Sequence, residues 1–134
     1  MARIRVLSTL AALAVALSIP GAALAAGSTA PARFCATAIA EFIPRHVDVG
    51  TAVSVNFGAD NCGNEKEHVL LTWRISGPCH PHVSGRDVFV LPRNSGVVAA
   101  FGFRPTCAGQ YRLTVRAYHK NRVVDVARAY LRAT

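Results

Sequence analysis

The feature that most limits the possible folds of this chain is its set of four cysteines, Cys35, Cys62, Cys79 and Cys107. None belongs to a Cys-x-x-Cys pair, and the two nearest in sequence are Cys62 and Cys79, so the spacing does not favour a zinc site. An even number of cysteines in a chain of this length is typical of a disulfide framework if the chain is exported. We therefore expect two disulfides, and the spacing by itself leaves three pairings open.

The amino-terminal residues have the features of an export signal. Arg3 and Arg5 form a short basic segment, residues 6–19 are apolar, and Ala23 and Ala25 supply a small-x-small cleavage pattern. The apolar run is short for a membrane span, and the absence of adjacent arginines argues against twin-arginine export. We predict a Sec-type signal peptide over residues 1–25 and a flexible leader over 26–33. The remaining chain would be secreted, either extracellular or held in the cell envelope, without a transmembrane segment.

The charge is strongly basic and carried mostly by arginine. Fifteen lysines and arginines oppose seven acids, for a formal net charge of +8. Lys66 and Lys120 are the only lysines, and alanine is frequent, which suggests a GC-rich bacterial genome. Codon bias could account for part of the arginine excess. Net charge of this sign also favours anionic partners.

Alternating apolar and polar residues predict strands separated by turns. The clearest run is 109–119, where Tyr111, Leu113, Val115 and Ala117 share one face. No stretch has a convincing helical period. The sequence predicts an all-β fold, a single seven-stranded antiparallel β-sandwich formed by residues 34–134. The expected strands are 34–43, 51–57, 68–75, 87–91, 97–103, 109–119 and 122–132, with a polar loop over 58–67.

Two features make this region resemble the immunoglobulin-like superfold. Trp73 lies on the third expected strand, where such domains bury a tryptophan, and Tyr111 opens the sixth in the manner of a tyrosine corner. The positions that carry the inter-sheet disulfide in antibody domains are here Val55 and Leu113. The chain therefore looks more like bacterial secreted immunoglobulin-like and fibronectin-type domains.

That resemblance implies a pairing of the cysteines. In such a topology Cys35 and Cys62 meet at the ends of the first two strands, and Cys79 and Cys107 meet between the third and sixth. We expect the disulfides Cys35–Cys62 and Cys79–Cys107, each with a structural role.

A basic face is the strongest functional signal. On the sheet expected from the third, sixth and seventh strands, alternation places arginines and two tyrosines on the side away from the core. The planar guanidinium group of arginine binds phosphate and carboxylate groups through pairs of parallel N–H donors, and tyrosines offer flat contact surfaces. The expected partner is an anionic cell-envelope polymer or a protein with an acidic patch; the alternative is a solvated face filled with arginine by codon bias. No nucleic-acid motif is present. The predicted binding residues are Arg74, Arg112, Arg116, Tyr118, Arg128, Tyr130 and Arg132.

Two other segments contain residues that could bind metal ions. His80 and His82 flank Pro81 and could hold copper or zinc, although no third ligand can be named. The acidic segment 60–67 could bind calcium, but it lacks the ordered oxygen ligands of a loop site. We expect neither a resident metal nor another cofactor.

The sequence does not predict an enzyme. The cysteines are assigned to disulfides, and no nucleophile motif such as Gly-x-Ser-x-Gly occurs. The leading hypothesis is a non-enzymatic exported binding module. The alternative is a secreted inhibitor of a protease or another hydrolase, presenting residues 79–86 or 92–96 as a rigid loop. The sequence does not predict the oligomeric state.

Overall fold

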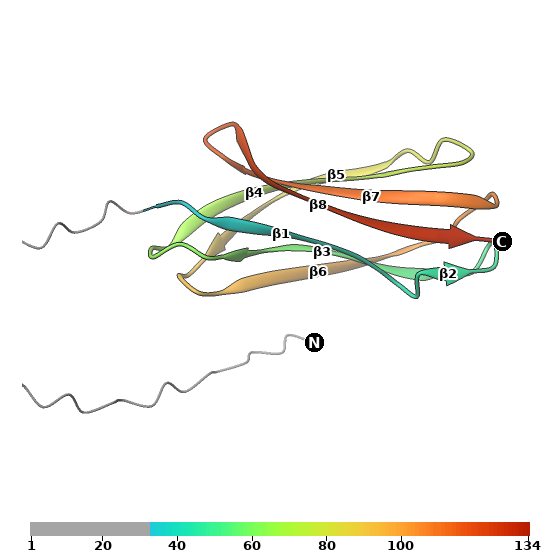
Figure 1. Ribbon diagram of the computed structural model, residues 1–134, viewed down its shortest axis with the longest axis horizontal. Helices are drawn as coiled ribbons and strands as arrows, with labels where there is room; N and C mark the ends of the chain where they lie inside the picture. The colour runs from blue at the N-terminus through green and yellow to red at the C-terminus, as the bar shows by residue number, and fades with distance from the viewer. Residues whose placement is uncertain (1–32) are drawn as a thin grey trace, which may run out of the picture. The chain divides into compact units, whose positions relative to one another are not determined.

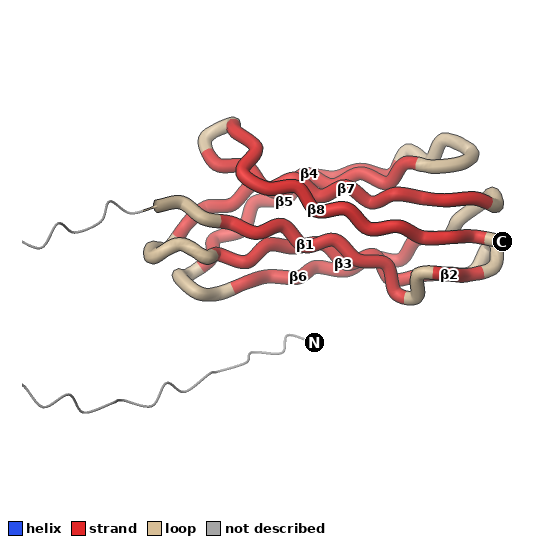
Figure 2. Tube along the Cα trace, viewed as in Figure 1, coloured by secondary structure: helices blue, strands red, loops and turns tan. Residues whose placement is uncertain are grey.

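The computed structural model describes residues 33–134, and the predicted signal peptide and nearly all of the leader lie outside this range. The described residues form β-strands joined by turns and loops (Figures 1 and 2). Within them there are eight strands: β1 (Ala36–Ile43), β2 (His46–Val47), β3 (Val53–Asn61), β4 (Glu67–Ser76), β5 (Val83–Leu91), β6 (Gly96–Phe103), β7 (Gly109–His119) and β8 (Arg122–Ala133).

The strands form two sheets that lie as two layers (Figure 1). The smaller sheet has the order β1-β3-β6, and the larger has the order β2-β8-β7-β4-β5. All pairs are antiparallel except β2 with β8. The expectation of seven antiparallel strands is therefore wrong in one respect: His46 and Val47 run parallel to the end of β8 and make that sheet mixed. Strand β2 contains only two residues, which are too few to produce a recognisable alternation in the sequence.

The core lies between the two sheets and is built from alternate residues of their strands. Val55, Leu71, Leu113 and Val115 are fully buried, and Tyr111 is 1% exposed. The face predicted to be apolar on β7 is therefore confirmed as the inward one. Trp73 points inward as expected but is only partly buried, where it packs against Phe57 and Phe101 with ring centroids 5.4 and 4.5 Å away.

Two strands are longer than the sequence predicted. β3 continues to Asn61, so the first part of the expected polar loop is strand. β5 begins at Val83 instead of Asp87. Its inward positions Gly85 and Asp87 are paired with Trp73 and Leu71 of β4. Glycine and aspartate are both uncommon in strands, so the sequence did not indicate a strand at these positions.

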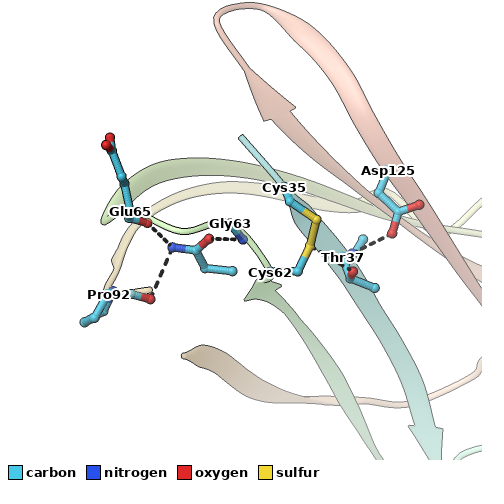
Figure 3. Close-up of a disulfide and its surroundings, with 9 residues drawn as sticks. Cys35, Thr37, Cys62, Gly63, Glu65, Pro92 and Asp125 are labelled. Atoms are coloured by element: carbon cyan, nitrogen blue, oxygen red, sulfur yellow. Dashed lines mark hydrogen bonds between the residues drawn. A yellow bond between two sulfur atoms is a disulfide. The ribbon is translucent and has the colours of Figure 1, made fainter. Parts of the chain in front are cut away.

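Both predicted disulfides are confirmed, with Cα–Cα distances of 4.9 Å for Cys35–Cys62 and 6.0 Å for Cys79–Cys107. The first joins the start of β1 to the end of β3 (Figure 3). The second joins the loop after β4 to the segment before β7, at the opposite end of the strands. No helix that could span a membrane occurs in residues 33–134.

Candidate anion-binding face

The seven residues predicted to bind a partner all lie on β4, β7 and β8, which are neighbours in the larger sheet. Tyr111, Leu113 and Leu131 point into the core, so the residues that alternate with them point outward. We call the outward side of β8, β7, β4 and β5 the arginine face. The register places the predicted residues on this side of the sheet.

Thr114 lies at the centre of the arginine face. It is paired with Arg74 on β4 and with Arg128 on β8, which places these two arginine Cα atoms about 10 Å apart. Arg112 and Arg116 lie two residues away along β7, each at a Cα distance of about 7 Å. Although Thr114 points outward, it is only 7% exposed. This burial is expected where four arginines surround a short threonine, since long arginine stems tend to lie along apolar surface with their charged heads in water.

The remaining predicted residues extend this cluster. Tyr130 is paired with Arg112 and is 48% exposed, so its ring is available beside a guanidinium group. Arg132 pairs with Gln110 nearer the end of the sheet, and Tyr118 pairs with Leu70 towards the opposite end.

The sequence prediction missed one arginine of the face. Arg86 on β5 is paired with Thr72, which is also paired with Arg116 on its other side. Arg86 therefore extends the cluster onto a fourth strand. It was missed because the expected strand began at Asp87. Only an assignment of Arg86 to a strand, where side chains alternate between the two sides of the sheet, would have placed it on the arginine face.

No acidic residue occupies an outward position of β4, β5, β7 or β8. Asp87 is registered with Leu71 on the inward side, where its carboxylate accepts a hydrogen bond from Trp73 Nε1 at 3.3 Å. Asp125 is registered with Ala117, and its carboxylate accepts a bond from the amide of Ala38 on β1 at 2.8 Å (Figure 3). The arginine face therefore carries positive charge without a carboxylate beside it, which strengthens its attraction for anions.

A small hollow borders the face where β4 ends. It has a volume of about 180 Å³ and is lined by Arg74, Ser76, Gly77, His80, Pro81 and His82. Ser76 is paired with Arg112, so the hollow adjoins the arginine cluster. The loop holds two successive non-glycine residues at positive φ, Cys79 at 59° and His80 at 46°. Such conformations persist only where the surrounding structure imposes them, and here the Cys79–Cys107 bond ties the loop to the segment before β7.

The hollow does not have the composition of a cation site. Arg74 shares it with both histidines and would repel a divalent cation. Residues 33–134 contain no group of three or more His, Cys, Asp or Glu side chains arranged to hold a metal ion. The copper or zinc alternative therefore gains no third ligand from the fold.

The acidic segment considered for calcium is organised by a buried amide. Asn61 is 2% exposed, and its Nδ2 lies within hydrogen-bonding distance of three carbonyl oxygens, those of Glu65 at 2.7 Å, Leu91 at 3.0 Å and Pro92 at 3.2 Å. Its Oδ1 accepts a bond from the amide of Gly63 at 2.9 Å (Figure 3). The amide of Asn61 thus fixes the loop against the β5–β6 turn, a role that the sequence prediction missed.

The two loops considered for an inhibitor are shorter than expected. Residues 83–86 belong to β5, which leaves only 77–82 as loop. The second is a tight turn in which the amide and hydroxyl of Ser95 both donate to the carbonyl of Pro92, at 3.3 and 2.6 Å.

No protein-family model matches the sequence, and no curated protein matches it. Solved structures share its fold. The CARDB domain of a Pyrococcus furiosus protein, crystallised in complex with di-metal ions, has a TM-score of 0.60 and 18% identity, and the match covers 76% of this chain and 93% of that domain. A solution structure of the same domain has a TM-score of 0.59 at 18% identity and covers 75% and 94%. A β-glucosidase from Erythrobacter marinus matches over 77% of this chain but only 16% of its own, with a TM-score of 0.53 and 11% identity. Identities this low show a shared fold and nothing more.

Proposed function

We propose that this protein is an exported, non-enzymatic binding module that holds an anionic polymer of the cell envelope on its arginine face. The observation that carries the proposal is the arrangement around Thr114, where four arginines surround one buried outward position on a face without a carboxylate. Each guanidinium group can donate two parallel hydrogen bonds to a phosphate, sulfate or carboxylate.

The dimensions of the face favour a polymer over a single small anion. The cluster spreads over four strands, from Arg128 on β8 to Arg86 on β5. The Cα atoms of Arg74 and Arg128 are about 10 Å apart, and both side chains are long, so successive anionic groups of one chain can be held at once. The exposed ring of Tyr130 provides a flat apolar surface beside Arg112 for a sugar ring.

Export of the protein from a bacterial cell is part of the proposal. Two disulfides in a short chain are typical of an oxidising compartment. They agree with the signal peptide predicted over residues 1–25. Retention in the envelope would then follow from binding of an anionic envelope polymer to the arginine face.

A hydrolase inhibitor is the weaker alternative. Its presenting loop would be 77–82, where Pro81 and the Cys79–Cys107 bond restrict the backbone. The same loop lines the hollow beside Arg74, which makes it part of the basic surface. Stoichiometric inhibition in a panel of proteases and glycosidases would support this alternative.

The test compares two triple variants that remove the same charge. The first is Arg112→Ala, Arg116→Ala and Arg128→Ala, from the arginine face. The control is Arg33→Ala, Arg45→Ala and Arg93→Ala, whose parent residues are exposed and lie outside that face. Retention of each protein is measured on immobilised dextran sulfate, polyphosphate and polygalacturonate, with neutral dextran as the blank.

We expect the parent protein and the control to elute at similar salt concentrations from at least one anionic matrix, and the face variant to elute at much lower salt. Exposed ionic contacts are screened within about 8–10 Å near physiological salt, so elution by salt reports on them directly. Equal weakening of both triple variants would show that only net charge matters and would overturn the proposal.

A further inference from the structure

We infer that the hollow at the end of β4 is a subsite for one tetrahedral oxyanion, a phosphate monoester or a sulfate ester carried by the bound partner. It is lined by Arg74, Ser76, His80 and His82, together with Gly77 and Pro81. This inference rests on the proposed function and deepens it, because it assigns a defined binding site for a single anionic group beside the arginine face.

The side chains of the hollow supply the donors that such an anion needs. Arg74 offers a planar fork, Ser76 a hydroxyl, and each imidazole a ring N–H. These donors reach the hollow from two directions, from the end of β4 and from the loop that follows it. A tetrahedral anion presents oxygens in several directions, whereas a planar carboxylate would leave some of these donors without an acceptor.

The size of the hollow also indicates a small group. Pockets for drug-sized ligands occupy about 300–1,000 Å³, and this hollow measures about 180 Å³. It therefore suits a phosphate or sulfate group, and the rest of a polymer would continue onto the sheet. Ser76 is paired with Arg112, which provides that continuation.

The loop that carries both histidines is held in place before any ligand arrives. Cys79 is bonded to Cys107, and the backbone of Cys107 is fixed by two hydrogen bonds with the Tyr111 hydroxyl. Pro81 further restricts the chain between the histidines. A loop that is already ordered loses little conformational entropy on binding. The positive φ angles of Cys79 and His80 therefore belong to a preformed site.

The test uses the disulfide-bonded protein and three probes, inorganic phosphate, inorganic sulfate and sodium acetate, titrated separately at constant ionic strength and pH. Binding is followed by NMR shifts of the backbone amides at positions 76, 80 and 82, which every variant retains. The test variant is His80→Gln with His82→Gln, and the control is His46→Gln with His68→Gln, whose parent histidines are exposed and do not line the hollow.

We expect phosphate, sulfate or both to produce saturable shifts at the three residues with a dissociation constant in the millimolar range or below. The affinity should fall at least tenfold in the test variant and stay unchanged in the control. The tighter of the two anions identifies the source of the oxyanion. Non-saturable shifts, equal binding of acetate, or equal losses in both variants would overturn the inference.

The outcome is separate from that of the proposed function. Failure of polymer retention together with saturable phosphate binding would reject the polymer and keep the hollow as an anion site. Polymer retention that depends on Arg128 without saturable phosphate or sulfate binding would reject the hollow and keep the face.

Discussion

The hydroxyl group of Tyr111 donates a hydrogen bond to the carbonyl oxygen of Cys107 at 2.8 Å and accepts one from the amide of the same residue at 3.0 Å. The tyrosine is 1% exposed and its ring packs edge-on against Phe103, with centroids 5.4 Å apart. Because Cys107 is also bonded to Cys79, this buried side chain positions the loop that borders the arginine face. The core of the domain and its candidate site therefore meet at Tyr111.

Replacement of Tyr111 by phenylalanine should keep the ring in the core but remove both hydrogen bonds. Loss of the partner for the Cys107 backbone should lower the free energy of unfolding by about 1–3 kcal/mol. Urea unfolding followed by circular dichroism measures this change. The control is Tyr130→Phe, because Tyr130 is 48% exposed and its substitution should change stability by less than about 0.5 kcal/mol. Equal stability of the two variants would show that the bonds to Cys107 contribute nothing.

The two disulfides should contribute similar stability but differ in their effect on binding. They enclose sequence separations of 27 and 28 residues. A chain-entropy estimate then gives about 3–4 kcal/mol for each. Urea unfolding of the Cys35→Ala/Cys62→Ala and Cys79→Ala/Cys107→Ala variants measures the stability that each disulfide contributes. Phosphate titration, at a temperature where both variants remain folded, measures the effect of each disulfide on binding.

Only removal of the Cys79–Cys107 bond should weaken phosphate binding, since the other bond lies at the far end of the strands. An equal loss of phosphate affinity in both double variants would contradict this relationship between the disulfide and the hollow.

Substitution of Asn61 by aspartate should be strongly destabilising. The side chains are nearly the same size, but aspartate would place an oxygen where Nδ2 now lies close to the carbonyls of Glu65, Leu91 and Pro92. Buried acceptors without a donor cost about 1–3 kcal/mol, and more when one is charged. Urea unfolding checks the result, with Asn64→Asp in the exposed part of the same loop as the control. Equal effects at the two positions would show that the amide of Asn61 does not hold the loop.

Much of the fold could be predicted because the relevant signals are local. The alternation at Tyr111, Leu113 and Val115 reports which side of β7 faces the core, and the observed strand has the predicted bounds. The same alternation placed Arg112 and Arg116 outward without knowledge of the partner strands. The tyrosine corner and the pairing of the cysteines followed from the resemblance to immunoglobulin-like domains, and both are present.

The missed features depend on contacts between residues far apart in sequence. Asn61 was read as part of a polar loop, because nothing near it in sequence shows that the carbonyls of Leu91 and Pro92 surround its amide. The hollow could not be foreseen either, since it depends on how the loop with His80 and His82 folds back towards Arg74. Strand β5 shows the same difficulty, because the ring of Trp73 covers Gly85 and replaces the apolar side chain that normally signals a strand.

This last contact gives a prediction with an internal control. A Cβ atom at Gly85 would lie 2.8 Å from Trp73 Nε1 and closer still to two carbons of the same ring, whereas at Gly102 it would meet nothing within 4 Å. Gly85→Ala should therefore displace the indole and lower the free energy of unfolding by about 1–3 kcal/mol. Gly102→Ala should be neutral or stabilising by up to about 1 kcal/mol, because it restricts the unfolded chain. Trp73 is the only tryptophan, so its fluorescence reports both the displacement and the unfolding transition. An unchanged emission spectrum and midpoint in Gly85→Ala would mean that the ring does not pack over β5.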